Sequence, residues 1–479
     1  MDRVASAPAF RVVELHLFER PLRFSKPLRI GATLAREGSQ AFVRARVEVD
    51  GFGEAVGAAA DLMAPCWYDQ RTELDAAEKL GELRASLLLA RDAVLACRSG
   101  TAFARHKAVA ALQGQACAGR FWPRLAIDYG PAIIERAVLD ALFRAVNVSF
   151  PQGMRRNLVG LDASSTPDVD PTSLTAFLAS RTIASRLGIR HTVFPEDDLD
   201  AFARLLEQSR LRWFKLVLTG DPARDATRLA DVARRLEAVP DAFVTLDGDE
   251  RYPDMPALAA LCDAVERDPR LAPISRGLLY IGQPFPRGVT LDMALGPIAK
   301  RHAFVIDGAD EDWDAFPRAR ALGYRGVTFR PGKGLFRTVL NAARAQQWRA
   351  QGQACFVTCE DLASPAGLAV QQDSLFAAFL GAAHAERNGH RFVDGFTGAP
   401  VGEAETFLAA HPDLYERGDG AIRLRTREGA LSLRGLDGPG FASAAMPAWD
   451  GLAQLGAPGS DAAGLLADAA LRRGRRAPE

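Results

Sequence analysis

Charged side chains stand at the ends of several short apolar runs, where they could take part in chemistry. Asp247 closes the run VTLD, Asp307 closes FVID, and another run, LLYIG, closes on Gly282. Two carboxylates from nearby strands are the beginning of a magnesium site, because this hard cation prefers oxygen ligands. An aspartate at the end of a strand can also cap the next turn, so each one taken singly has a structural explanation.

Eight short apolar runs that alternate with amphipathic helices would have to position these residues. From about Arg190 the runs are RHTVF, WFKLVL, AFVTLD, GLLYIG, AFVID, GVTF, CFVTC and AAHAE. Repeated strand-helix units predict a TIM-like α/β barrel, in which all strand ends gather at one mouth. An open doubly wound sheet is the rival fold, but no G-x-G-x-x-G follows an early strand. In strand order from the second to the eighth, the mouth would carry Lys215, Asp247, Gly282, Asp307, Arg330, Glu360 and Glu386.

The regions on either side of the barrel have different sequence patterns. Residues 10 to 68 alternate as strands do, with a hairpin signal at Asp50-Gly51, and residues 71 to 148 have helical periods. We therefore expect an N-terminal α+β capping domain over residues 1–150 and a barrel over 151–395. The Gly-, Pro- and Ala-rich residues 396–479 are expected to return to the cap.

Composition limits the classes of partner. The 479 residues contain 59 Lys plus Arg and 59 Asp plus Glu, so no net field would attract nucleic acid. No apolar run approaches the roughly 20 residues that span a bilayer, and the start has no apolar signal segment, which predicts a cytoplasmic protein without a membrane partner. The six cysteines form no C-x-x-C pair and are expected to be reduced thiols.

Several longer stretches between residues 10 and 395 occur in a distinctive order. They are PLRFSKPLRIG, VRARVEVDGFGEA, FKLVLTGDPARDATRLADVARRL, VTLDGD, YIGQPFP, FVIDGAD and RNGHRF. This order resembles the enolase superfamily, mandelate racemase and muconate-lactonising branch. The resemblance implies a modified (β/α)7β barrel under a capping domain, and a homo-oligomer is one expectation because relatives of this architecture often assemble. It also implies magnesium-assisted removal of the proton next to a substrate carboxylate.

The resemblance implies three acidic magnesium ligands, and the sequence supplies two of them. Asp247 and Asp307 match the ligands of the third and fifth strands, whereas Gly282 replaces the middle one and puts magnesium in doubt. Fewer ligand charges mean weaker binding. Asp249 or Asp310 could substitute as a ligand, and Asp249 is also a candidate contact to the substrate.

The positions that resemble catalytic bases are also altered. The second strand has Lys215 and then Val217, where relatives carry Lys-x-Lys, and the sixth strand has Arg330, where many carry a lysine. Arginine cannot exchange protons usefully near neutral pH, but it can clamp a carboxylate. Lys333 is a further candidate for substrate binding, although it and Arg330 could equally be solvated charges.

Two hypotheses about function follow. In the first, the barrel mouth is shaped for a small carboxylic acid, and the magnesium-assisted reaction is altered or lost. In the alternative, the protein is an active isomerase or lyase of the racemase or acid-sugar dehydratase type. Asp247 and Asp307 would then hold magnesium, Lys215 and Arg330 would bind the carboxylate, and Glu386 would donate a hydrogen bond to the enediolate.

Overall fold

The computed structural model describes residues 6–30, 33–361 and 363–456. Its N-terminal part is an antiparallel sheet of three long strands, β1 (Phe10–Ile30), β2 (Thr33–Val49) and β3 (Gly53–Met63). The β2–β3 hairpin turns at Asp50-Gly51, as the sequence predicts, and Gly51 takes a positive φ of 78° there.

Helices cover this sheet and lead to the barrel. They are α1 (Pro65–Tyr68), α2 (Ala76–Ala96), α3 (Ala102–Ala116), α4 (Arg124–Ala145), α5 (Phe150–Arg155) and α6 (Pro171–Ala179). The long helix α4 lies against β3 so closely that a Cβ on Gly57 would stand 2.2 Å from the Ala141 nitrogen. This close packing makes the sheet and its helices one α+β unit.

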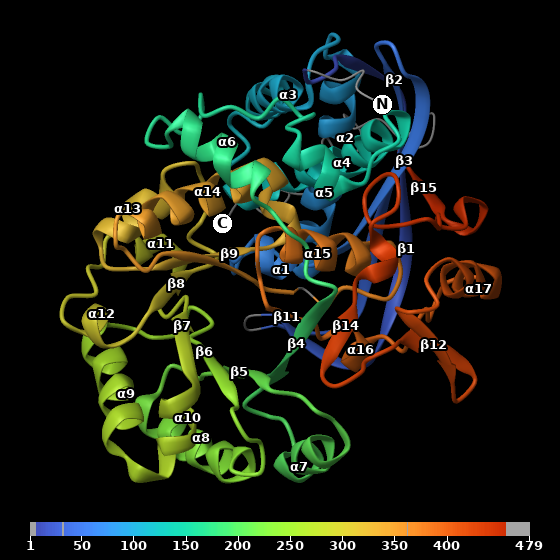
Figure 1. Ribbon diagram of the computed structural model, residues 1–479. Coiled ribbons are helices and arrows are strands. Elements are labelled where there is room, and N and C mark those ends of the chain that lie inside the picture. The colour runs from blue at the N-terminus through green and yellow to red at the C-terminus, as the bar shows by residue number, and fades with distance from the viewer. Residues whose placement is uncertain (1–5, 31–32, 362, 457–479) are drawn as a thin grey trace, which may run out of the picture.

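Eight parallel strands form the barrel (Figure 1). They are β4 (Arg186–Val193), β5 (Trp213–Val217), β6 (Phe243–Asp247), β7 (Leu278–Gly282), β8 (Phe304–Ile306), β9 (Gly326–Phe329), β10 (Phe356–Cys359) and β11 (His384–Glu386). Ladders join neighbours in chain order from β4 to β10, and β11 pairs with β4. The predicted TIM-like barrel with an N-terminal cap is therefore confirmed.

Helices connect most of the strands. These are α7 (Leu199–Gln208), α8 (Pro222–Leu236), α9 (Met255–Arg267), η1 (Pro269–Leu271), α10 (Ala272–Gly277), α11 (Arg287–Thr290), α12 (Ile298–Arg301), α13 (Ala315–Ala321), η2 (Pro331–Lys333), α14 (Leu335–Ala350) and α15 (Leu368–Phe379). Helix α8 begins with an Asp221 cap, whose side chain accepts hydrogen bonds from two backbone amides, and has Pro222 in its first turn.

After the barrel the chain runs back along both units. It forms α16 (Gly389–Phe392), α17 (Val401–Ala410), the hairpin β12 (Tyr415–Gly418) and β13 (Ala421–Leu424), β14 (Ala430–Ser432), η3 (Arg434–Leu436), η4 (Trp449–Gly451) and β15 (Ala453–Leu455). Strand β14 pairs with β4 of the barrel, and β15 pairs with β1 of the cap. Residues 457–479 of the expected C-terminal segment lie outside the described residues.

The cap closes over the barrel mouth through apolar contacts from β1. Leu22, Phe24 and Leu28 of β1 form a small buried cluster with Phe392 and Val393, which follow the last barrel strand. This contact holds the far end of the cap sheet beside the strand exits, where a ligand pocket would lie. Among the described residues, no helix is both long and apolar enough to cross a bilayer.

Candidate active site at the barrel mouth

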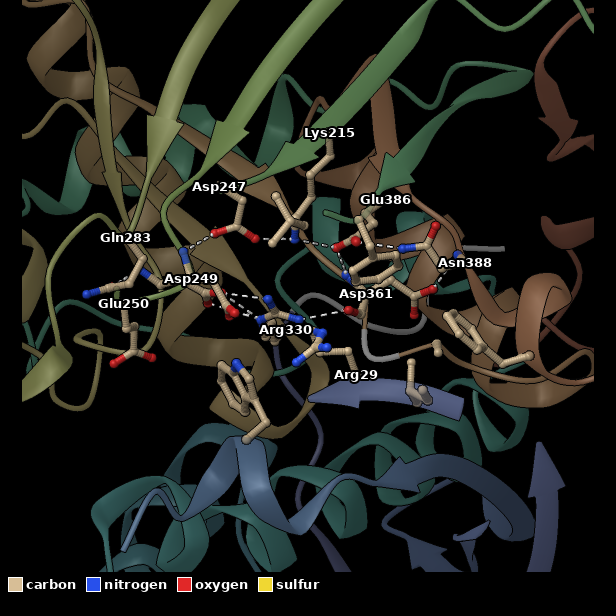
Figure 2. Close-up of a pocket in the computed structure, with 17 residues that line it drawn as sticks. Arg29, Lys215, Asp247, Asp249, Glu250, Gln283, Arg330, Asp361, Glu386 and Asn388 are labelled. Carbon is tan, nitrogen blue, oxygen red and sulfur yellow. Dashed lines mark hydrogen bonds and ion pairs between the residues drawn. The ribbon is translucent and has the colours of Figure 1, made fainter. Parts of the chain in front are cut away.

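A cavity of about 90 Å³ lies between the barrel mouth and the cap, and we call it the inner cavity (Figure 2). Its volume leaves room for several water molecules or a small ligand. Barrel residues at its wall include Lys215, Asp247, Asp249, Asp307, Arg330 and Glu386, and cap residues include Leu28, Arg29 and Trp67. The predicted strand-end residues therefore do converge, with Lys333 and Glu360 just outside the wall.

Asp307, directly after β8, is held by two cations. The Arg330 guanidinium binds it in a fork, with Nη2 2.6 Å and Nε 2.8 Å from Oδ2, and Lys333 Nζ lies 3.0 Å from Oδ1. Burial alone would raise the pKa of Asp307, but Arg330 and Lys333 hold that pKa well below its usual range. The carboxylate is therefore ionised, and its charge is already compensated within the protein.

Lys333 serves this cluster rather than the cavity. Its side chain is fully buried, and Nζ also donates to the Asp307 carbonyl at 2.7 Å and to Thr328 Oγ1 at 3.0 Å. Burial lowers the pKa of Lys333 despite the nearby Asp307 charge. Lys333, which the sequence suggested as a substrate contact, therefore directs its donors at Asp307 and Thr328 in this structure.

The cap fixes Arg330 from the other side. The ring of Trp67 on α1 lies 4.8 Å from the Arg330 guanidinium carbon, in cation–π geometry. Arg330 Nη1 also donates to the Asp361 carbonyl at 2.8 Å. The guanidinium is thus held by β8, by the loop after β10 and by the cap, so it is a rigid part of the site.

Lys215, in the middle of β5, is surrounded by three carboxylates. Its Nζ lies 2.7 Å from Asp247 Oδ2, 2.7 Å from Glu360 Oε2 and 3.1 Å from Glu386 Oε2. Burial alone would lower the pKa of Lys215, but the three acids raise it well above its usual range. An ammonium has three N–H donors. All three are used here, so the predicted binding of a substrate carboxylate by Lys215 would require an ion pair to break.

Glu386, at the end of β11, is a fully engaged carboxylate. Its Oε1 accepts hydrogen bonds from Thr192 Oγ1 and Asn388 Nδ2, both at 2.6 Å, and its Oε2 accepts from the Asp361 amide at 3.0 Å. Burial alone would raise the pKa of Glu386, but chiefly the Lys215 charge lowers it to about 2. The donor role expected of Glu386 needs a protonated acid, and these contacts oppose protonation.

Below the cavity, a second layer of polar residues supports Glu360. Arg190 on β4 is completely buried, binds Glu360 after β10, and donates to the Cys359 carbonyl at 2.8 Å. Tyr280 on β7 donates to Glu360 Oε1 at 3.1 Å. Sequence analysis missed Arg190 and Tyr280, although a charge within the apolar run RHTVF was a usable signal.

Around the ends of β6 and β7 the backbone is unusual. Asp249, Glu250 and Gln283 have positive φ values of 47°, 63° and 33°. Such backbone angles cost energy in residues other than glycine and cluster at functional sites. Burial and the adjacent Asp247 charge raise the pKa of Asp249 to about 6, while Arg251 at 2.8 Å acts against that rise.

The overall structure is shared with proteins of known family. No family model matches the sequence, and no curated protein matches it either. A solved mandelate racemase/muconate lactonizing protein from Herpetosiphon aurantiacus is 16% identical, with a TM-score of 0.58 over 90% of this chain and 98% of that one. The chain has the enolase-superfamily fold. A dipeptide epimerase from Cytophaga hutchinsonii, solved with Mg and D-Ala-L-Val, is 10% identical, with a TM-score of 0.59 over 93% and 99% of the two chains.

A third structure, the L-Ala-D/L-Glu epimerase from Bacillus subtilis, is 12% identical, with a TM-score of 0.57 over 91% of this chain and 99% of that one. At such identities the likeness shows the fold alone. It does not transfer the epimerases' substrates or the magnesium of the Cytophaga structure to this chain.

The side chains at this barrel mouth do not fit a magnesium ion. Gly282 offers no ligand between Asp247 and Asp307, and both flanking carboxylates already have cationic partners. Among the described residues, no group of three or more His, Cys, Asp or Glu is arranged to hold a metal. Magnesium binding would require Lys215, Arg330 and Lys333 to give up contacts that neutralise buried charge.

Proposed function

We propose that this chain binds a small carboxylic acid in the inner cavity, without the magnesium ion and without the proton abstraction of its structural neighbours. The observation that carries this proposal is the pairing of Asp307 with Arg330 and Lys333. These fixed cations occupy the carboxylate that would otherwise be a metal ligand. A guanidinium that is already in place provides positive charge without a metal.

The lack of a proton acceptor at Lys215 supports the same conclusion. A lysine acts as a base only when its amine is neutral, and contact with Asp247, Glu360 and Glu386 keeps this one charged. Val217 stands two residues later on the strand, where relatives carry the second lysine of their pair. The strand that would supply the base therefore supplies only a buried ion pair.

Two arginines support binding of an acid ligand. Arg330 uses Nε, one N–H of Nη1 and one of Nη2 in its protein contacts, which leaves two of its five N–H groups. Arg29 bonds through Nε to Glu196 at 2.7 Å, and within the described part of the chain its two terminal nitrogens have no hydrogen-bond partner. Both residues line the inner cavity, one from the cap and one from the barrel.

The opposite wall defines the rest of the ligand. Asp247, Asp249 and Glu250 bring three carboxyl groups to the cavity. Carboxylates accept hydrogen bonds and repel a second anion at close range. A hydroxy acid, whose carboxylate faces the arginines and whose hydroxyl groups face these acids, satisfies both walls.

Binding and exchange measurements test this proposal together. Metal-free protein is screened by ligand-observed NMR against small carboxylic and hydroxy acids, and the best binder is titrated into wild type, Arg29→Met and Arg23→Met. Arg23 is an exposed arginine on the same strand and is the matched control. We expect Arg29→Met to weaken binding about tenfold, the loss of one charge-assisted contact, and Arg23→Met to have no effect.

The same samples are then incubated in D₂O with and without magnesium. Our proposal predicts no deuterium at the carbon next to the carboxylate. Exchange that appears only with magnesium would instead establish the alternative, an active isomerase or lyase, and would refute the proposed loss of the reaction.

A further inference from the structure

The cap and the barrel meet in a buried polar contact between β3 and α15. Gln372 Nε2 on α15 donates to the Ala58 carbonyl on β3 at 2.8 Å. In addition, Arg136 Nη2 on α4 lies 2.6 Å from Asp373 Oδ1 on α15, and both side chains are buried. Each of these two bonds joins a cap residue to a barrel residue, so this contact helps to hold the two units together.

Asp61 of β3 is the unusual residue of this contact. Its side chain is fully buried, and among the described residues neither carboxylate oxygen has a hydrogen-bond partner or a cationic group within 4.0 Å. Burial and then the charge of Asp373 raise the pKa of Asp61 well above its usual range, against the effects of Arg136 and the Leu62 amide. An unpaired carboxylate is costly to bury, so this acid keeps its proton where an exposed aspartate would lose it.

Charged and titratable groups face Asp61 from three other elements and from one loop. They are Tyr68 of α1, Tyr129 and Arg136 of α4, Asp373 of α15 and Asp361 after β10. Burial and the Asp61 charge raise the pKa of both tyrosines, so their hydroxyls stay protonated beside it. Arg136 attracts a charge on Asp61, but it is already bonded to Asp373, and both neighbouring aspartates repel that charge. Loss of the Asp61 proton therefore puts an unpaired negative charge into the contact.

The four-residue helix α1 connects this contact to the wall of the inner cavity. Tyr68 of α1 faces Asp61, and its hydroxyl packs so closely on the loop after β9 that a Cβ on Gly332 would lie 2.0 Å from it. The ring of the preceding residue, Trp67, lies 4.8 Å from the Arg330 guanidinium carbon and lines the inner cavity. The Trp67 and Tyr68 rings also pack edge to face, with centroids 4.9 Å apart. Movement of Tyr68 therefore displaces Trp67 at the cavity wall.

We propose that Asp61 is a proton-dependent latch between the cap and the barrel. While Asp61 carries its proton, it is neutral and β3 packs against α15; loss of the proton loosens this contact and moves α1 away from the inner cavity. Because the folded state binds this proton more tightly than the unfolded chain, its stabilising effect is complete below about pH 3.9, the pKa of an unfolded aspartate. The effect is lost as the pH rises through the higher pKa of Asp61 in the folded state. Since no ligand takes part, the latch does not depend on the proposed function.

Infrared spectroscopy tests whether Asp61 carries the proton. Spectra of wild type and Asp61→Asn are subtracted at a series of pH values, since asparagine keeps the shape of the side chain and cannot ionise. We expect the band of a protonated carboxylic acid in this difference at pH 6, about two units above the pKa of an unfolded aspartate. The same subtraction with Asp50→Asn, which changes an exposed aspartate in the β2–β3 turn, should show no acid band at pH 6. No acid band in the Asp61 difference would overturn the proposal.

Urea unfolding at the same pH values measures what the proton does for stability. The unfolding constant of wild type, divided by that of Asp61→Asn, should rise by up to tenfold per pH unit above pH 4 and level off at the pKa of folded Asp61. The corresponding ratio for Asp50→Asn should change less than twofold. Asp61→Val, which also cannot ionise, should give the same slope and replaces the asparagine variant if that one does not fold. A ratio that stays constant from pH 4 to pH 9 would refute the latch.

Hydrogen exchange locates the part of the protein that responds. Protection of the backbone amides is compared at pH 6 and at a higher pH, where the acid band has disappeared. We expect β3, α1 and α15 to lose protection at least tenfold in wild type and to keep it in Asp61→Asn, whereas α8 of the barrel stays protected in both. An equal loss in α8 would show a global destabilisation, and unchanged protection of β3, α1 and α15 would show that the contact does not loosen; either result overturns the latch.

Discussion

Replacing Arg330 with methionine isolates the pair on which the proposed function depends. Arg330 makes three hydrogen-bond contacts to the Asp307 carboxylate and one to the Asp361 carbonyl, and it stacks on Trp67. Breaking one side of a buried ion pair costs about 3–5 kcal/mol, because the other charge stays buried. Lys333 remains beside Asp307 in the variant, so we expect a loss near the lower value, about 3 kcal/mol.

Urea unfolding measures this loss, with Arg417→Met as the control. Arg417 pairs with Glu405 at 2.6 Å, but the two side chains are 59% and 43% exposed. An exposed pair contributes about 0–1 kcal/mol, so the control variant should unfold almost like wild type. If Arg330→Met is within about 1 kcal/mol of wild type at pH 7, the Asp307 carboxylate does not depend on Arg330, and our reasoning fails.

The pH dependence of the same difference gives a second check. Despite burial, Arg330 and Lys333 hold the pKa of Asp307 well below its usual range, so the folded state binds this proton less tightly than the unfolded state. The stabilisation is fully present above about pH 3.9, the pKa of an aspartate in the unfolded chain. It is lost as the pH falls through the lower pKa of Asp307 in the folded state. The difference in unfolding free energy between wild type and Arg330→Met should therefore be largest near neutral pH and become smaller below about pH 4. A gap of constant size from pH 7 to pH 3 would argue against the ion pair.

Two further predictions concern the acid at β11 and the contact between cap and barrel. Glu386→Gln should be less stable than wild type at pH 7, and this difference should disappear as the pH falls from about 4 to about 2, because Lys215 and its neighbours lower the pKa of Glu386 to about 2 against the effect of burial. Thermal midpoints against pH check this, and a difference that persists unchanged at pH 2 would contradict it. Gly332→Ala should cost about 1–3 kcal/mol, since its Cβ would lie 2.0 Å from the Tyr68 hydroxyl, whereas Gly81→Ala on α2, with open space around it, should stabilise by up to about 1 kcal/mol. Equal denaturation midpoints for these two alanine variants would show that Tyr68 of the cap does not pack closely against Gly332.

The barrel could be predicted from the sequence because its pattern is local. Short apolar runs that alternate with amphipathic helices define strand-helix units, and parallel strands bring all their ends to one edge. Lys215, Asp247, Gly282 and Asp307 were therefore placed on the correct strands. The first strand begins earlier than predicted, at Arg186, and it includes Gly188, where a Cβ would stand 2.5 Å from the Trp213 ring.

The contacts inside the mouth could not be predicted in the same way. Several cationic side chains could pair with Asp307. The choice among them depends on side-chain rotamers and on the stagger of the strands around the barrel, and the hydrophobic periodicity of the sequence specifies neither. Arg190 on β4 pairs with Glu360, which lies 170 residues later in the chain, and no spacing in the sequence indicates this contact. Trp67 comes from the cap, and its position depends on how two separately patterned units pack together.

The most direct test of the metal-free site is a calorimetric titration of magnesium into chelator-stripped protein, with and without the acid found by NMR. We predict no binding heat and no change in melting temperature up to about 10 mM magnesium, because Asp247 and Asp307 are held by Lys215 and by Arg330 with Lys333. Saturable binding between micromolar and low millimolar magnesium, strengthened by the acid, would contradict this account and would return magnesium-assisted proton abstraction to the barrel mouth.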